Sequence, residues 1–253
     1  MTMQVAPKTS VAIMQPYVFP YLGYYQLAHT ADHFVFYDDV QFMKGGWVNR
    51  NRISNQGKPL IFTIPARGVS SSAQIMDIGC GVDAKFQKKF LRQLEQEYRK
   101  APHVEAVVDL VAKTLSGPHE GNMSKLAIAS VRNVFDYLDL PLSDQVSSLD
   151  HPRADIKGSE RVIAVTKALG GQRYVNLPGG VSLYSTDEFA QSGIDLKFIQ
   201  DQSAPYTQFN HPFIPRLSII DVMMHNSPDR LRVMLDQVAL RSADDMGTPE
   251  SDD

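Results

Sequence analysis

The chain has 253 residues, of which 43% are hydrophobic and 21% charged, so it is long enough to bury the core of one large α/β domain. The formal net charge of −3 argues against nucleic acid as a partner, and a single cysteine excludes an intramolecular disulfide and a cysteine-rich zinc site. No apolar run approaches the roughly 18 residues of a membrane helix, and the first ten residues lack the apolar core of a signal peptide. These features predict a cytoplasmic protein without a membrane span.

The stretch 11–52 contains two short apolar runs that each end in polar residues. The run 11–14 stops at Gln15, and the run 34–37 stops at Asp38. Both are predicted to be buried strands, because their length and composition suit the interior of a sheet.

A helix over residues 21–31 would connect these two strands. A strand, a crossover helix and a second strand form a right-handed parallel unit. Ligands of such sheets bind beyond the carboxyl ends of the strands, which places the expected crevice at residues 15–19 and 38–44. Pro16 and Pro20 restrict the backbone and should make the first of these turns stiff.

The glycine pair 45–46 predicts a turn before the segment 47–52, Trp-Val-Asn-Arg-Asn-Arg. Its two guanidinium groups and two amides suit a phosphate or a carboxylate. Residues 60–65, LIFTIP, are apolar enough for an interior strand of the sheet. The following loop 67–72 consists of small residues, so it is either an anion-binding loop or a plain surface loop.

The hydrophobic period then changes to that of helices. Asp83 is placed as the N-cap of one helix, Pro102 fits the first position of a second, and residues 124–138 form a third. The segment of about 83–140 is therefore predicted to be a helical insertion.

Helix and strand alternate again in the second half of the chain. We expect a helix over 159–169, a strand over 173–176, a short helix opened by the capping box of Ser185 and Glu188, and an edge or half-buried strand over 194–199.

Two further helices should begin near Leu217 and at Ser227–Pro228. The predicted fold is α/β, with a mostly parallel open sheet of the Rossmann-like or nucleotidylyltransferase-like kind and a helical insertion. The predicted organisation is an N-terminal extension 1–10, a domain 11–240 and a disordered acidic tail 241–253.

Common catalytic and metal-binding templates are absent from the sequence. It has no GxxxxGK[ST], GxGxxG, HExxH or GxSxG motif. His29 and His33 are four residues apart, but their position fits a polar helix terminus better than a metal site, and no metal is expected.

The best candidates for chemistry lie in and after the opening stretch, and each also has a structural interpretation. Asp38 and Asp39 could act as a base or form a solvated turn, and we favour function because Lys44 and Arg50 should lie nearby. Trp47 could stack on a sugar or pack in the core.

A second group of candidates lies near the C-terminus. Tyr206 and Gln208 form a polar aromatic cluster with His211 behind them. Asp221 follows an apolar pair, so its carboxylate must be paired, and we expect an arginine such as Arg50 or Arg216 to pair with it.

Several of these segments together resemble the WbqC-like proteins, a bacterial family associated with O-antigen and other surface-glycan gene clusters. The resemblance rests on QPYVFPYLGYYQL, FVFYDDVQFMKGGWVNRNRI, FTIPARG and YTQFNHPFIPRLSIIDVMMHN, and extends over about residues 11–240. It implies a glycine or aminoacyl transferase that acts on an amino sugar.

We therefore expect an N-acyltransferase that uses an activated acyl donor, such as a carrier-protein or other thioester, and a sugar nucleotide or amino sugar as acceptor. Asp38 or Asp39 would be the base, and Asn49, Asn51 and Arg50 would stabilise the oxyanion or hold phosphate. Two alternatives are nucleotidyl transfer or ligation with ATP and Mg²⁺ in the same crevice, and a non-catalytic binding protein of a glycan pathway. Acyl carrier protein is a candidate partner.

The residues expected to bind substrate are Gln15, Tyr17, Tyr24, Lys44, Trp47, Asn51, Tyr184, Tyr206, Gln208 and Asp221. Cys80 lies between two glycines ahead of a helix, a position that could activate a thiol, but it is outside the segments that carry the resemblance. We expect direct acyl transfer without a covalent intermediate at Cys80.

Overall fold

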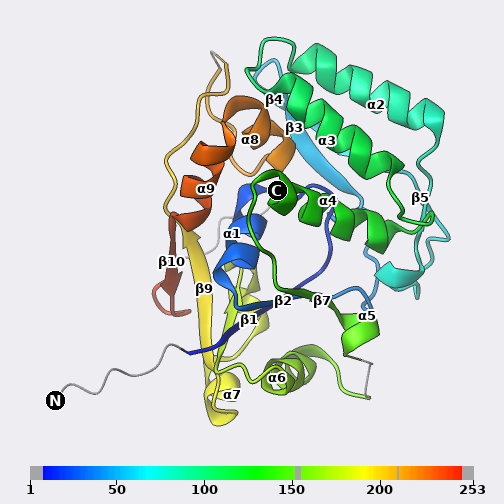
Figure 1. Cartoon of the computed structure of the whole chain (residues 1–253). Helices are drawn as coiled ribbons and strands as arrows, with labels where there is room; N and C mark the ends of the chain where they lie inside the picture. Colours follow the sequence, from blue (N-terminus) through cyan, green and yellow to red (C-terminus); the bar gives the residue numbers. More distant parts are fainter. Residues whose placement is uncertain (1–7, 152–154, 210, 247–253) are drawn as a thin grey trace.

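The computed structural model of the protein describes residues 8–151, 155–209 and 211–246. Its centre is an open six-stranded sheet with the order β10-β9-β8-β1-β2-β7 (Figure 1). All neighbouring strands are parallel except β9 and β10. The strands are β1 (Ser10–Met14), β2 (His33–Phe36), β7 (Asp144–Val146), β8 (Arg173–Asn176), β9 (Asp195–Asp201) and β10 (Val238–Arg241). The predicted α/β class with a mostly parallel open sheet is confirmed, and the arrangement is compatible with a Rossmann-like fold.

The alternation of side chains along β1 and β2 divides the core between the two faces of the sheet. Ala12 and Phe34 belong to the larger hydrophobic cluster on one face, whereas Val11, Ile13 and Val35 belong to the cluster on the other face. Because both faces are covered, these strands contain almost only apolar residues, as expected for parallel strands.

Helices cover both faces of this sheet. On the larger side lie α1 (Leu22–Thr30), α4 (Met123–Tyr137), α8 (Ile219–His225) and α9 (Pro228–Asp236). On the other side lie α6 (Gly158–Ala168) and α7 (Thr186–Gln191). The predicted unit of strand, helix and strand at the start of the chain is confirmed, because α1 connects two parallel neighbours, β1 and β2.

A second layer of helices lies beside the sheet, on the right of Figure 1. It consists of α2 (Ala84–Glu97) and α3 (Val104–Ser116), which pack against each other and, through α3, against α4. Asp83 is the N-cap of α2, as predicted, and its carboxylate accepts a hydrogen bond from the Phe86 backbone N–H at 2.7 Å. The second helix begins at Val104 with His103 as N-cap, two residues later than the position of Pro102 suggested.

The segment 60–65 does not form an interior strand of the main sheet. Its residues belong mainly to β4 (Lys58–Thr63), which pairs with β3 (Arg50–Asn55) in a separate antiparallel hairpin. Gln56 and Gly57 at the turn both have positive φ, the backbone that two-residue hairpins require. One face of β4 packs on α2 through Phe62 and Phe90, while Ile61 on the opposite face is exposed.

The remaining short elements connect these layers. They are β5 (Ala66–Arg67), which pairs with β6 (Gly79–Cys80), the 3₁₀ helices η1 (Ile75–Asp77) and η2 (Pro178–Leu183), and α5 (Ser147–Asp150).

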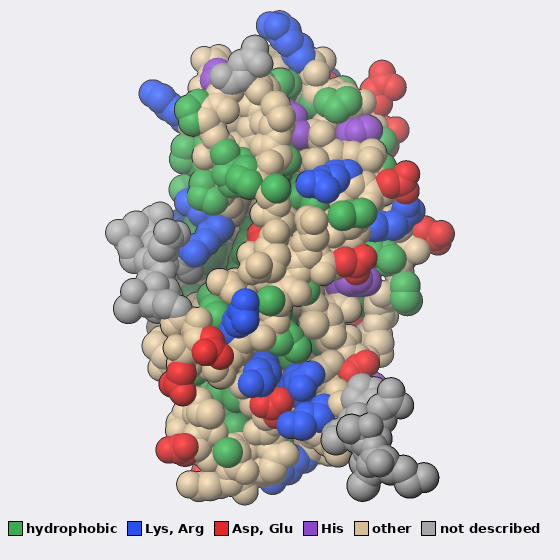
Figure 2. Space-filling model, turned by 90° about the vertical axis from the view of Figure 1, so that its left-hand side faces the viewer, with side chains coloured by type: hydrophobic (Ala, Val, Ile, Leu, Met, Phe, Trp, Pro, Cys, Tyr) green, Lys and Arg blue, Asp and Glu red, His purple; other side chains and the backbone are tan. Residues whose placement is uncertain are grey.

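Strand β10 pairs with residues 198–201 of β9, so only the first residues of β9 lie at the edge of the sheet, and the alternating burial along its first residues fits the predicted half-buried strand. Figure 2 looks onto this side of the molecule and shows basic and acidic side chains interspersed around the edge. Asp195, for example, forms ion pairs with Lys8, Arg173 and Lys197. Charged side chains along a sheet edge oppose pairing with a second molecule. Of the predicted terminal segments, residues 1–7 and 247–253 lie outside the described structure.

The N-cap of α2 gives a direct test of this arrangement. Replacing Asp83 with alanine removes the acceptor for the Phe86 N–H, and such a loss costs about 0.5–2 kcal/mol. We expect Asp83→Ala to lower the thermal midpoint by a few degrees and Asp83→Asn to restore most of it. Equal midpoints for the alanine variant and the wild type would show that the cap contributes nothing.

Candidate functional site

A cavity of about 380 Å³ lies beyond the carboxyl ends of β1 and β8. The chain continues from β1 to β2 on one side, whereas β8 is the neighbour of β1 on the other side. The strand order therefore reverses between β1 and β8, and open α/β sheets bind their ligands at such a switch point. Of the two predicted crevice segments, 15–19 contributes to the cavity wall and 38–44 does not.

The turn after β1 is held in a strained backbone conformation at Phe19, whose φ is 44°. A bulky residue rarely adopts this left-handed conformation, so the surrounding structure must impose it. The Phe19 N–H donates to Ser130 Oγ at 2.9 Å, and its carbonyl accepts from Asn51 Nδ2 at 2.8 Å and from Ser218 Oγ at 2.7 Å. Three side chains from α4, β3 and the start of α8 thus fix the turn.

The segment before α8 is joined to the same turn by its backbone. The Ser218 N–H donates to the Arg52 carbonyl at 2.8 Å, and the Ile219 N–H donates to the Pro20 carbonyl at 2.8 Å. These bonds bring Arg216 to the cavity wall next to residues of β3. The cavity is therefore enclosed by segments that are far apart in the sequence.

Two arginines of β3 lie against the only tryptophan of the chain. The guanidinium carbons of Arg50 and Arg52 are 5.0 and 5.3 Å from the centroid of the Trp47 ring, within the range of cation–π attraction. Arg52 and Trp47 line the cavity. The Nε atoms of both arginines are buried and have no hydrogen-bond partner among the described residues.

The electrostatic character of the cavity favours an anion. Its described lining includes two arginines, Arg52 and Arg216, and no aspartate or glutamate. Pro20 and Tyr21 also line it, so α1 begins at the cavity, and this helix has no side-chain cap and no acidic residue in its first turn. The partial positive charge at a helix N-terminus attracts anions and adds to the field of the arginines.

Five of the residues predicted to bind substrate line this cavity: Gln15, Tyr17, Trp47, Asn51 and Tyr184. Asn51 is engaged in structure, because its amide donates to Phe19 and its Oδ1 accepts the Arg52 N–H at 2.8 Å. Gln15 follows β1 directly and is one of the lining residues.

The other candidates of the opening stretch are placed elsewhere in the structure. Tyr24 is buried beneath the turn, and its hydroxyl donates to the Gln15 carbonyl at 2.9 Å. Asn49 donates its amide to the Ile64 carbonyl at 2.7 Å. Lys44 is exposed on the outer surface, and Arg50 lies on Trp47 without lining the cavity.

Asp38 and Asp39 are each only 4% exposed and lie outside the cavity lining. Asp38 accepts hydrogen bonds from the hydroxyls of Ser124 and Ser148, both at 3.0 Å. Asp39 forms a buried ion pair with Arg161 at 2.5 Å. These contacts join the end of β2 to α4, α5 and α6.

The ion pair nevertheless has a link to the cavity. The Arg161 guanidinium carbon lies 5.2 Å from the centroid of the Tyr37 ring, and Tyr37 lines the cavity. The geometry therefore gives Asp39 a positioning contact, through Arg161, with a ring of the cavity wall.

Asp221 does not take an arginine as its partner, which corrects the prediction. It is completely buried, and the hydroxyls of Tyr98 and Tyr206 donate to it at 2.5 and 2.7 Å. Burial, together with the adjacent Asp221 carboxylate, raises the pKa of both tyrosines, so they remain donors. Gln208 is part of the same network, donating to the Tyr206 hydroxyl at 2.9 Å.

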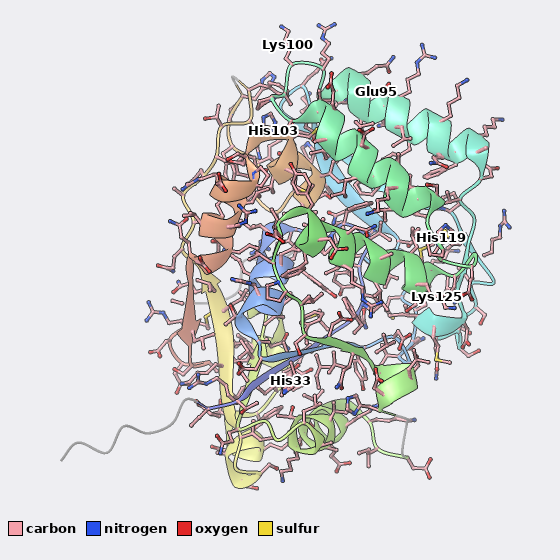
Figure 3. The ribbon with its side chains drawn as sticks, in the orientation of Figure 1. His33, Glu95, Lys100, His103, His119 and Lys125 are labelled. Carbon is pink, nitrogen blue, oxygen red and sulfur yellow. The ribbon has the colours of Figure 1, made fainter. Side chains whose placement is uncertain are left out.

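The histidines do not gather at one place. Figure 3 shows His33, His103 and His119 on separate parts of the molecule, and His29 pairs with Asp236 at 3.0 Å. Within the described ranges, no group of three His, Cys, Asp or Glu residues could hold a metal ion. None of the helices in this part of the chain is long and apolar enough to cross a membrane.

Comparison with known proteins agrees with the resemblance seen in the sequence. The model of the WbqC-like protein family matches residues 15–233. The chain belongs to this family. It is also 30% identical over 227 residues to the uncharacterized protein Rv1507c of Mycobacterium tuberculosis (strain ATCC 25618 / H37Rv), covering 88% of this chain and 97% of that protein. No solved structure matches the chain.

The family model covers every residue of the cavity lining except Ile13 and Met14. Asn176 and Gly180 also line the cavity, although neither is among the residues predicted from the sequence to bind substrate. Asn176 is the last residue of β8, just as Gln15 is the first residue after β1. A polar residue at the carboxyl end of a buried strand could therefore have indicated Asn176 from the sequence. A Cβ at Gly180 would lie 2.5 Å from Asn176 Nδ2, so a larger residue at this position would displace the Asn176 amide.

Breaking the Asp39–Arg161 pair should destabilise the protein. Removal of one partner from a buried ion pair leaves an uncompensated charge, and we expect Asp39→Ala to lower the free energy of unfolding by about 3–5 kcal/mol. Asp229, which pairs with Arg232 but is 91% exposed, is the matched control, and Asp229→Ala should cost less than about 1 kcal/mol. Equal losses in urea unfolding would contradict the assignment.

Cys80 should be an unreactive thiol. It is 5% exposed in β6, and burial raises the pKa of the thiol, so its thiolate fraction at pH 7–8 is below that of an ordinary cysteine. We expect slow labelling by a thiol reagent in the native protein and fast labelling after unfolding. Cys80→Ser should retain activity, whereas rapid native labelling would contradict this account.

Proposed function

We propose that this WbqC-like protein is an N-acyltransferase that transfers a glycyl or similar aminoacyl group to a nucleotide-linked amino sugar in surface-glycan biosynthesis. The observation that carries the proposal is the cavity at the switch point, in which two arginines and aromatic side chains occur together without a described acidic residue. This combination suits a ligand that has both phosphate and ring components.

The diphosphate of the sugar nucleotide would lie between Arg52 and Arg216, near the start of α1. Arginine forks bind phosphate oxygens in pairs, and the buried Arg52 Nε is without a partner among the described residues. Trp47 lies on the Arg52 guanidinium, which limits the conformations of that side chain before the ligand arrives. An arginine ordered in this way loses less entropy on binding.

The rings of the ligand would pack on the aromatic wall. Tyr17, Tyr37 and Trp47 all line the cavity, and aromatic faces bind both sugars and bases. Tyr37 is supported from behind by Arg161, so the pair of Asp39 and Arg161 would act as positioning residues for the substrate.

In the transfer step, the sugar amine attacks the carbonyl carbon of an acyl thioester. The new C–N bond forms as the C–S bond breaks, and the proton lost by the amine passes to the leaving thiolate. Gln15 is our candidate donor to the developing oxyanion, because the amides of Asn49 and Asn51 are already bound to backbone carbonyls. Proximity of the two substrates supplies the main part of the acceleration.

Nucleotidyl transfer is less well supported by this cavity. That reaction uses magnesium held by carboxylates, and the described lining contains none. Release of pyrophosphate from ATP with magnesium would favour it over acyl transfer.

Binding can be tested with UDP-glucosamine, because Trp47 is the only tryptophan. We expect saturable quenching of its fluorescence in the wild type. A hydrogen bond to a charged group contributes about 1.5–3 kcal/mol, so Arg52→Ala should raise Kd roughly 10- to 100-fold.

The matched control is Arg92→Ala, which removes the same charge from the exposed face of α2 and should leave Kd unchanged. Equal weakening by both substitutions, or fluorescence that does not respond to UDP-glucosamine, would contradict the proposed site.

A further inference from the structure

A second cavity, of about 440 Å³, adjoins the first. The two share four lining residues: Tyr21, Leu177, Gly179 and Arg216. They are therefore two compartments of one cleft, with a tyrosine and an arginine at the junction.

The junction depends on a glycine at the start of α1. A Cβ at Gly23 would lie 2.6 Å from the Tyr21 ring, so only glycine leaves room for that ring in its present position. Gly23 lines the second cavity, and Tyr21 lines both. The Tyr21 ring thus forms part of the partition between the compartments.

The two compartments differ in chemistry. The second is walled mainly by apolar residues from α1, β9, α8 and α9, including Leu22, Ile199, Val222 and Met234. Its acidic residue is Asp201, whereas the first compartment has none in its described lining. An anionic sugar nucleotide suits the first compartment, and an uncharged, largely apolar ligand suits the second.

One residue that lines the second compartment, Gln26, carries a buried acceptor without a partner among the described residues. Gln26 is completely buried, and its Nε2 donates to Asp201 Oδ1 and to the Met234 carbonyl, both at 2.9 Å. Because Nε2 faces these acceptors, the orientation of the amide is fixed. The Gln26 Oε1 atom has no partner among the described residues. Leaving such an atom unsatisfied is costly, so it favours a ligand that brings an N–H donor.

We propose that the second compartment binds the acyl donor through an extended, uncharged arm that carries amide N–H groups and ends in a thioester. The apolar part of the arm packs on the walls named above, one amide donates to Gln26 Oε1, and the thioester carbonyl lies at the junction beside Tyr21 and Arg216. The acceptor amine reaches this carbonyl from the first compartment. This inference rests on the proposed acyl transfer, and it assigns each substrate its own subsite.

The test uses pantetheine, an uncharged chain with two amides and a terminal thiol, and the full-length protein. Saturable binding measured by calorimetry is expected in the wild type, with the same Kd in the presence of saturating UDP-glucosamine. Ala204→Trp places bulk in the second compartment from an exposed loop position, so it should abolish pantetheine binding without lowering the thermal midpoint. Gln26→Met should weaken pantetheine binding roughly tenfold.

Three outcomes would overturn the inference. The first is the absence of saturable pantetheine binding to the wild type. The second is competition between pantetheine and UDP-glucosamine. The third is loss of UDP-glucosamine binding in Ala204→Trp, which would mean that one long ligand fills the whole cleft. Failure of the proposed function gives a different pattern, because UDP-glucosamine would then leave Trp47 fluorescence unchanged while pantetheine still binds.

Discussion

The site depends on the left-handed backbone of Phe19. Holding a bulky residue in this conformation costs on the order of 1–3 kcal/mol, and three hydrogen bonds from side chains on separate elements offset the cost. The same bonds bring β3, α4 and the start of α8 together around the turn that follows β1. Arg52 and Arg216 lie close to residues that make these bonds. The hydrogen bonds that hold Phe19 therefore also position the two arginines of the cavity wall.

Charged side chains are distributed unevenly around the first cavity. The chain has a net charge of −3, but the acidic pair that follows β2 does not line the cavity. Asp38 accepts hydrogen bonds from serine hydroxyls, and Asp39 forms an ion pair with Arg161. The described lining of the cavity contains Arg52 and Arg216 and no aspartate or glutamate. A low-dielectric pocket with charge of one sign concentrates its field on an incoming ligand of the opposite sign. The pairing of Asp39 with Arg161 places this carboxylate outside the described lining of the cavity.

Local patterns in the sequence predicted most of the fold. The short apolar runs predicted β1 and β2, and the caps at Asp83 and Ser185 marked helices because capping is a local interaction. The partners of Asp221 could not be predicted, because the tertiary fold brings Tyr98, 123 positions away, and Tyr206 to its carboxylate. The placement of β4 failed for a related reason: an apolar run indicates burial but does not tell which strand lies beside it. Asp38 and Asp39 show that a polar residue after a strand can face the interior as readily as a cleft.

The long sequence separation of the contacts around the opening strand and turn has a consequence for how the chain folds. Contacts that join the first strand to distant segments lower the folding rate, because a long loop must close before they form. The bonds that fix Phe19 join residues 32, 111 and 199 positions apart. The opening turn can therefore make all three of these bonds only after Ser218 has been synthesised. A fragment that lacks the C-terminal quarter of the chain would lack both Ser218 and the Arg216 wall of the cavity.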